Sequence, residues 1–188
     1  MAIEVRYKWT RGLSMRVVKN GDVHVTAPIG MSRRDVQAFI DSHRAWIENA
    51  RAKSSRRQER RAEFYSRLPL DTRARKIEAA KQLDTIVRPI AARYSEIMDV
   101  SPSAISYRPM ISRWGVCKIK ERSICLSTYL LLLPPELIEH VVVHELCHLI
   151  EPSHNARFHR LMDTYYPEWK RARRDTRRIV EAGAANRP

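Results

Sequence analysis

The chain has 188 residues, 44% of them hydrophobic, which is typical of one compact domain and excludes a fibrous or wholly disordered protein. Three cysteines are too few for a disulfide framework, and no run of 18 apolar residues occurs, so we expect reduced thiols and no membrane-spanning helix. The formal net charge of +14 indicates an acidic partner, and the charged N-terminal residues lack the apolar stretch of a signal peptide, which predicts a cytoplasmic protein.

The first 30 residues have the pattern of a small β region. Residues 3–9 are expected to form a strand, and Asn20-Gly21 lies between two extended runs in which valines alternate with polar residues. Because both residues of Asn-Gly tolerate the positive φ of a type I′ turn, we predict an antiparallel hairpin. Beyond it the apolar spacing changes to three and four, so Ser32 is predicted to cap a helix that runs into the basic stretch near 51–63.

The middle of the chain has a long helical pattern. It follows a break at Asp71, is expected to be interrupted or kinked at Pro89, and ends at Ser101-Pro102. Two short β-type runs come next, "ISYRP" and "SICLSTY", which a polar turn around Lys118–Arg122 is predicted to join. These elements predict an α+β fold with a second, short sheet.

The segment that follows combines an apolar helix with titratable groups. Pro134 and Pro135 are expected to open this helix, in which His144 and His148 lie four residues apart and so project from one face. Apolar residues occupy almost all of the remaining circumference, so burial would impose a desolvation cost of several kcal/mol on unpartnered imidazoles. A divalent metal would relieve that cost. With Glu145 between them, the two histidines form an HExxH pattern, in which the imidazoles bind zinc and the acid is the general base.

A catalytic zinc ion has three protein ligands and one open position, so a third ligand is expected nearby. Pro152 disfavours helical geometry at Glu151, so the helix is predicted to stop there and the chain to turn back. That turn would bring His154 into reach of the metal, and Asn155 is predicted to cap the next helix. His154 is therefore the preferred third ligand.

The interval from His148 to His154 is the one that separates the last two ligands of the metzincin pattern. The glycine of that pattern is absent, since Glu151 stands in its place, and no Met-turn is evident, so we reject a metzincin. Two competitors for the third ligand stay open: Glu168 on the next element, and His159.

Several motifs in order resemble the YgjP-like metallopeptidase family, a zincin group related to the WLM and SprT-like proteases. The stretches that carry the resemblance are "SRWGVC" at 112–117, "LLLLPPELIEHVVVHELCHL" at 130–149, "SHNARF" at 153–158 and "YYPEW" at 165–169. The N-terminal "VTAPIGMSRRDVQAFIDSHRAWIE" fits the opening of the same family. Departures are Val116, where members often have Ser, and His159, where they often have Trp; the strands usual between the first helix and the long helical region are shortened or missing.

The resemblance implies a single zincin-like domain over residues 1–188. Its parts would be an N-terminal β region at 1–30, a helical region at 31–100 and a zinc-binding catalytic core at 101–188. It also implies His144, His148 and His154 as zinc ligands and Glu145 as the catalytic acid and base.

The sequence therefore predicts a zinc-dependent peptidase that acts on peptide or protein substrates. The strand "SICLST" at 123–128 is expected to edge the cleft and to pair with an extended peptide. Tyr165, Tyr166 and Arg113 are candidate oxyanion donors, although a structural role is simpler for each. His140 and Glu151 are candidates for hydrogen bonds that orient the ligands.

The alternative is a basic nucleic-acid-associated protein, either with a structural zinc site or as a protease of DNA-bound proteins. Arginine-rich helices at 51–61 and 170–178 would contact phosphates in that case. A solvated helix face is the simpler interpretation of the same residues. Nothing in the sequence predicts an oligomeric state.

Overall fold

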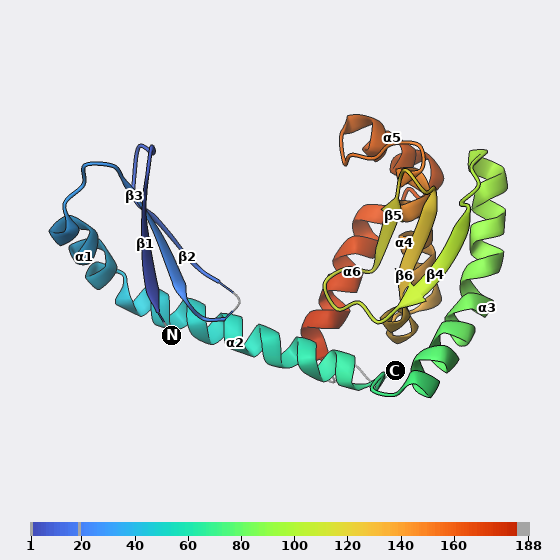
Figure 1. Ribbon diagram of the computed structural model, residues 1–188, viewed down its shortest axis with the longest axis horizontal. Helices are drawn as coiled ribbons and strands as arrows, with labels where there is room; N and C mark the ends of the chain where they lie inside the picture. Colours follow the sequence, from blue (N-terminus) through green and yellow to red (C-terminus); the bar gives the residue numbers. More distant parts are fainter. Residues whose placement is uncertain (1, 19, 184–188) are drawn as a thin grey trace. The chain divides into compact units, whose positions relative to one another are not determined.

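The computed structural model describes residues 2–18 and 20–183 and divides the chain into two compact units, Met1–Ala62 and Glu63–Pro188 (Figure 1). Each unit has its own cluster of buried apolar side chains. The fold is α+β, as predicted, because each unit combines a three-stranded sheet with helices. The single-domain organisation expected from the length of the chain stays a prediction.

The first unit contains a mixed sheet in the order β1-β3-β2, followed by α1 and the start of α2. Its elements are β1 (Ile3–Lys8), β2 (Ser14–Val17), β3 (Val23–Pro28), α1 (Arg33–Ser42) and α2 (Arg44–Ser66). β2 and β3 pair antiparallel, which confirms the predicted hairpin, and Gly21 in its turn has a φ of 83°. β1 adds to the other edge of β3 in parallel.

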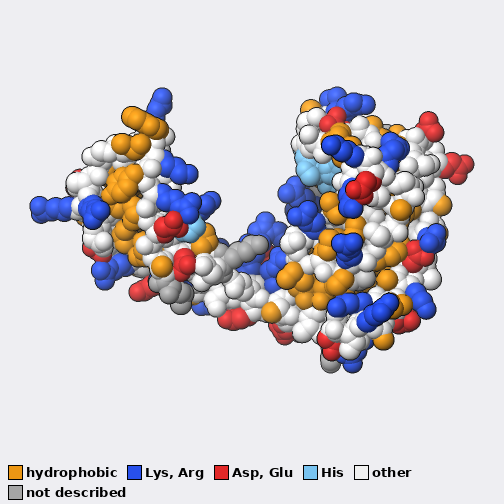
Figure 2. All heavy atoms as spheres, viewed as in Figure 1, with side chains coloured by type: hydrophobic (Ala, Val, Ile, Leu, Met, Phe, Trp, Pro, Cys, Tyr) orange, Lys and Arg blue, Asp and Glu red, His pale blue; other side chains and the backbone are white. Residues whose placement is uncertain are grey.

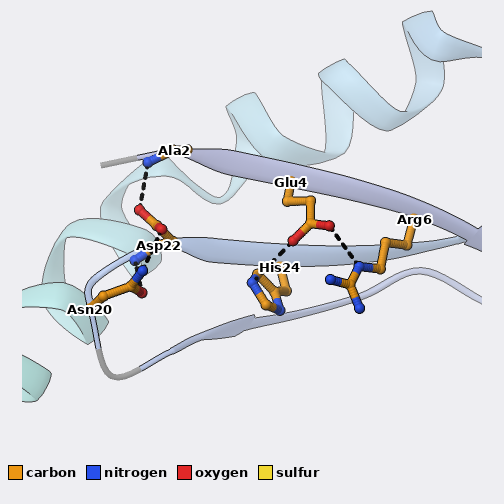
Figure 3. A network of polar contacts seen from close by, with 6 residues as sticks. All are labelled: Ala2, Glu4, Arg6, Asn20, Asp22 and His24. Carbon is orange, nitrogen blue, oxygen red and sulfur yellow. Dashed lines mark hydrogen bonds and ion pairs between the residues drawn. The ribbon is translucent and has the colours of Figure 1, made fainter.

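Polar contacts tie the start of β1 to the turn between β2 and β3 (Figure 3). The backbone N–H of Ala2 donates to Asp22 Oδ1 at 2.6 Å, and the side-chain amide of Asn20 donates to the other carboxylate oxygen at 2.6 Å. Further along the strand, Glu4 accepts from Arg6 at 2.7 Å and lies 3.2 Å from His24. His24 thus has a structural partner, Glu4, at the sheet surface.

The helix predicted to begin after Ser32 does begin there, but it is divided. The Ser32 hydroxyl accepts from the backbone N–H of Asp35 at 3.1 Å, which confirms the cap. At His43 the backbone leaves helical geometry, with φ −110° and ψ 14°, and the ring contacts the carbonyl of Phe39 at 2.8 Å. The continuous helix that we expected is therefore wrong, since this local contact ends α1 and α2 starts one residue later.

The second unit is built around a mixed sheet in the order β4-β6-β5 and the helix α4. α4 contacts α3, α5, α6 and the strands β5 and β6 (Figure 1). The elements are α3 (Arg73–Met98), β4 (Ala104–Arg108), β5 (Gly115–Lys118), β6 (Ser123–Ser127), the 3₁₀ turn η1 (Thr128–Leu132), α4 (Pro135–His148), α5 (Ala156–Tyr165) and α6 (Trp169–Ala182).

The short sheet differs from the predicted one in two respects. β5 was not expected as a strand, and it follows β4, so the two predicted β runs are not joined directly. β6 was expected to edge the cleft, but it pairs in parallel with β4 and antiparallel with β5. Both backbone edges of β6 are therefore engaged, and β5 is the edge strand beside α4.

The helices of this unit begin largely where the sequence predicted. α3 continues through Pro89 without interruption and ends at Met98, where Asp99 takes a left-handed conformation with φ 50°. Pro135 opens α4 as expected. The cysteines are free, with Cys125 and Cys147 buried and Cys117 partly so. Among the described residues, no helix combines the length and the apolar character that crossing a bilayer requires.

Candidate metal centre

α4 presents His144 and His148 from one face, while most of the helix beyond its first turn is buried. The neighbours Val141, Val142, Val143, Leu146 and Cys147 are at most 6% exposed. Burial, together with neighbouring histidines, lowers the pKa of His144 to about 3, and burial also lowers the pKa of His148. Both imidazoles are therefore neutral at neutral pH, which is the form that binds a metal ion.

The turn after α4 has the geometry that the sequence predicted. α4 ends at His148, and the backbone carbonyl of Glu151 lies 3.1 Å from His148 Nδ1. The Glu151 carboxylate accepts from the backbone N–H of Ser153 at 3.2 Å. Asn155 then caps α5, since its side-chain oxygen accepts from two backbone N–H groups at 2.9 and 3.1 Å. These contacts hold the chain so that His154 returns toward α4.

The three histidines meet at their Nε2 atoms. His154 Nε2 lies 3.1 Å from His144 Nε2 and 3.1 Å from His148 Nε2, and the three potential ligand atoms lie within 4.8 Å of one another. A proton on His148 Nδ1, donated to the Glu151 carbonyl, leaves the lone pair of Nε2 directed at the cluster. Three imidazole nitrogens that converge in this way fit a divalent transition metal.

The ring of Phe158 contacts the rings of all three histidines. Its ring centroid lies 4.9 Å from that of His144, 4.6 Å from His148 and 4.7 Å from His154, and the side chain is buried. Because its contacts fix the directions of the imidazoles, Phe158 is part of the site in a structural sense. Sequence reasoning assigned it no role, although it stands only four residues after His154, in the first turn of α5.

Glu145 lies beside the cluster on the same helix. It is 4% exposed, and its Oε2 has no hydrogen-bond partner among the described residues. Burial raises the pKa of Glu145 to about 7, against the opposing effects of the Arg113 charge and a backbone hydrogen bond from Cys117. A carboxyl group near half ionisation at neutral pH can both accept and release a proton.

Gly115, at the start of β5, makes room for this carboxylate. A Cβ atom at that position would lie 2.5 Å from Glu145 Oε1 and 2.7 Å from its Cδ. The glycine in "SRWGVC" is therefore required by the close approach of the strand to the acid. Sequence reasoning did not find this contact, since β5 was not predicted.

The histidines and Glu145 open into a cleft of about 660 Å³. Figure 2 shows the histidine side chains at the surface of the second unit, with Lys and Arg side chains close by. β5 and α6 supply other parts of the wall, including Cys117, Trp169 and Arg173. The cleft is thus large enough to admit part of a substrate, and the three histidines line it.

A sequence model described as the YgjP-like metallopeptidase domain matches residues 11–79 and 70–178. The chain belongs to the YgjP-like metallopeptidase family. It is therefore a metallopeptidase, a hydrolase whose substrates are peptides or proteins, and a metal ion is expected in it. The predicted family and enzyme class are confirmed.

Two crystal structures of metallopeptidase zymogens are similar to parts of this YgjP-like chain. Abylysin of Pyrococcus abyssi is 24% identical with a TM-score of 0.44, over 50% of this chain and 91% of its own. Jannalysin of Methanocaldococcus jannaschii is 19% identical with a TM-score of 0.45, over 50% of this chain and 96% of its own. No curated protein matches the chain.

The competitors for the third ligand position lie outside the cluster of this YgjP-like protein. Of the described residues, the group that brings three potential ligand atoms together contains neither Glu168 nor His159. Glu168 precedes α6 and lies 3.6 Å from Arg171. His159 lines the cleft, but its ring stacks on Trp169 with centroids 5.3 Å apart and planes 4° from parallel.

The remaining candidates are divided between the cleft and other surroundings. Arg113 and His140 line the cleft, whereas Tyr165 and Tyr166 do not. The Tyr166 hydroxyl donates to the backbone carbonyl of Glu136 at 2.8 Å, a structural contact. Glu151 contacts His148, but through its backbone carbonyl rather than its carboxylate.

Proposed function

We propose that His144, His148 and His154 hold a zinc ion and that Glu145 is the general base of peptide hydrolysis. The observation that carries the proposal is the convergence of three Nε2 atoms within 4.8 Å beside a buried carboxylate with an unpartnered oxygen. When bound, zinc would supply a Lewis acid that activates water and polarises the scissile carbonyl. The third ligand is His154 because neither alternative shares the cluster.

Glu145 would move the proton in both halves of the reaction. It accepts a proton from the attacking water while the oxygen forms a bond to the carbonyl carbon. It then delivers that proton to the amide nitrogen as the carbon–nitrogen bond breaks. A pKa of about 7 suits both steps, because the group is neither a very weak base nor a very weak acid at neutral pH.

β5 would align the substrate, in place of the strand that we first expected. One edge of β5 pairs with β6, and residues 115–117 line the cleft, so the other edge is available to an extended peptide. Backbone hydrogen bonds to a strand edge bind a peptide with little regard to its side chains. This placement supports hydrolysis of extended segments rather than of folded helices.

Glu145→Gln tests the assignment of the base. The substitution removes proton transfer but retains the size of the side chain, so cleavage of casein is expected to fall by about 10²- to 10⁴-fold. Metal analysis should show an unchanged stoichiometry, because Glu145 is not a proposed ligand. Glu136→Gln, the same change in the exposed first turn of α4, is the matched control. Casein cleavage by Glu145→Gln at the wild-type rate would refute the role.

Association with nucleic acid stays a prediction, and the second arginine-rich stretch offers it little support. On α6, Arg178 lies 3.3 Å and Arg171 3.6 Å from the carboxylate of Asp175, and Arg177 lies 3.1 Å from Glu181. Charges paired along one helix attract phosphates less than unpaired ones. Filter binding across salt concentrations decides the matter, since a slope near zero in log affinity against log salt would exclude phosphate contacts.

A further inference from the structure

The charged groups of the cleft are unequally distributed. Its wall contains two arginines, Arg113 and Arg173, and one acid, Glu145. Neither guanidinium makes an ion pair with any residue in the described part of the chain, in contrast to the paired arginines of α6. A cleft of this composition favours an anionic group on its ligand.

The two arginines have different surroundings. Arg113 precedes β5, and its charge acts on Glu145, the acid proposed to handle the proton. An anionic substrate group at Arg113 would therefore meet a like charge whenever Glu145 is ionised. Arg173 is on α6 and is not among the charges that act on Glu145. Arg173 is therefore the better site for an anion.

His140 adds a second observation at the Arg173 side. It lines the cleft, is 8% exposed, and its Nδ1 has no hydrogen-bond partner among the described residues. The charge of Arg173 acts on this ring, so the two side chains are neighbours in the cleft. An imidazole offers an N–H donor, which complements a guanidinium in binding a carboxylate.

We propose that the cleft selects peptides with a carboxylate near the scissile bond, and that Arg173, assisted by His140, forms the subsite for that carboxylate. The inference rests on the proposed peptidase function. An acidic side chain and a free C-terminus present the same chemistry. A guanidinium binds either one through two parallel N–H···O bonds.

The test compares three fluorogenic peptides of one sequence. The neutral peptide has Gln next to the scissile bond and an amidated C-terminus close to it; the second peptide has Glu in place of this Gln, and the third has a free C-terminus. For the wild-type chain, kcat/KM is expected to be about tenfold higher for one of the two carboxylate peptides than for its neutral counterpart. The pair that shows the difference identifies the source of the carboxylate.

Arg173→Gln should reduce this ratio to about one. Arg174→Gln removes the same charge from the same helix, at a residue that does not line the cleft, and should retain the ratio. Three results would overturn the proposal: ratios near one for the wild-type chain, an unchanged ratio in Arg173→Gln, or an equal loss in both variants, which would indicate a long-range charge effect.

Binding separates this inference from the proposed function. Fluorescence anisotropy with labelled forms of the same peptides and the Glu145→Gln chain measures Kd without turnover. Tighter binding of the carboxylate peptide, lost in Glu145→Gln/Arg173→Gln, supports the subsite even if no peptide is hydrolysed. Hydrolysis without any carboxylate preference in rate or Kd would leave the peptidase assignment intact and refute the subsite.

Discussion

Glu145 shows at the level of one residue how the fold accommodates a group that it would not otherwise bury. The carboxylate is 4% exposed and one oxygen is unpartnered among the described residues, so its ionised form is costly. A nearby cation would stabilise the ionised form of Glu145. His144 and His148 are on the same helix as the acid, and His154 returns to that helix. In the metal-free protein, stability therefore favours the protonated form of Glu145, whereas its proposed role as a base requires the ionised form.

This conflict predicts a pH-dependent stability difference. The pKa of Glu145 rises from an ordinary 4.5 to about 7 in the folded chain. Between these pH values the folded state binds more protons than the unfolded state, so the chain loses stability as the pH rises from 4.5 to 7. Glu145→Gln is expected to remove that loss. In metal-free protein the variant should exceed the wild type by on the order of 1–3 kcal/mol at pH 8 and by far less at pH 4.

Chemical denaturation of both chains at pH 4 and 8, with chelator present, measures this difference. Other titrating groups are shared by the two chains and cancel in the comparison. A difference that is the same at both pH values would show that the substitution acts through packing rather than through ionisation.

Gly115→Ala tests the contact between β5 and the acid. The new Cβ would lie 2.5 Å from Glu145 Oε1, so the carboxylate must move. We expect peptidase activity to fall by about 10²-fold, since small displacements of reacting groups have effects of that size, with a loss of about 1–3 kcal/mol in stability. Gly12→Ala is the control, because nothing lies within 4 Å of a Cβ there. Equal activity of the two variants would contradict the proposed role of Gly115.

At the level of elements, the turn between α4 and α5 was predictable and the strand beside it was not. Pro152 and Asn155 act through local rules of backbone geometry, and both have their expected effects. β5 has only four residues, and its pairing with β6 is not encoded in a local pattern. The packing of Phe158 on three imidazoles was not predictable either. It depends on how α4 and α5 pack against each other, which no local sequence pattern specifies.

The α5 cap connects the turn to the metal site. Asn155→Ala removes the acceptor of two backbone N–H groups and is expected to cost about 1 kcal/mol of stability. Because His154 immediately precedes this cap, the affinity for zinc should also fall, by about tenfold. Competition with a chromophoric chelator measures that affinity. Ser32→Ala removes the corresponding cap of α1 and should leave zinc affinity unchanged; a fall as large as that in Asn155→Ala would refute the link.

At the scale of the whole molecule, the family match covers residues from both units, yet all three histidines and Glu145 belong to the second. Length and composition could not predict this division, since 188 residues suit one domain as well as two small units. The position of the site within the chain, by contrast, followed from the spacing of the histidines alone.

Metal removal should destabilise the chain through this one site. A ligand that binds only the folded state stabilises it by about 4 kcal/mol at a concentration 1,000 times its Kd. Excess zinc should therefore raise the midpoint of thermal unfolding by several degrees, and chelator should reverse the shift. In His154→Ala the shift should largely disappear, which calorimetry of both chains measures. A full shift in this variant would return the third-ligand role to Glu168 or His159.

Phe158 makes the cation site and the hydrophobic interior share one side chain. Any attempt to alter metal preference by enlarging or reshaping the imidazole triangle would therefore have to redesign the interior at the same time. Variants selected for altered metal affinity are therefore expected to change in folding stability as well, so the two properties must be optimised together.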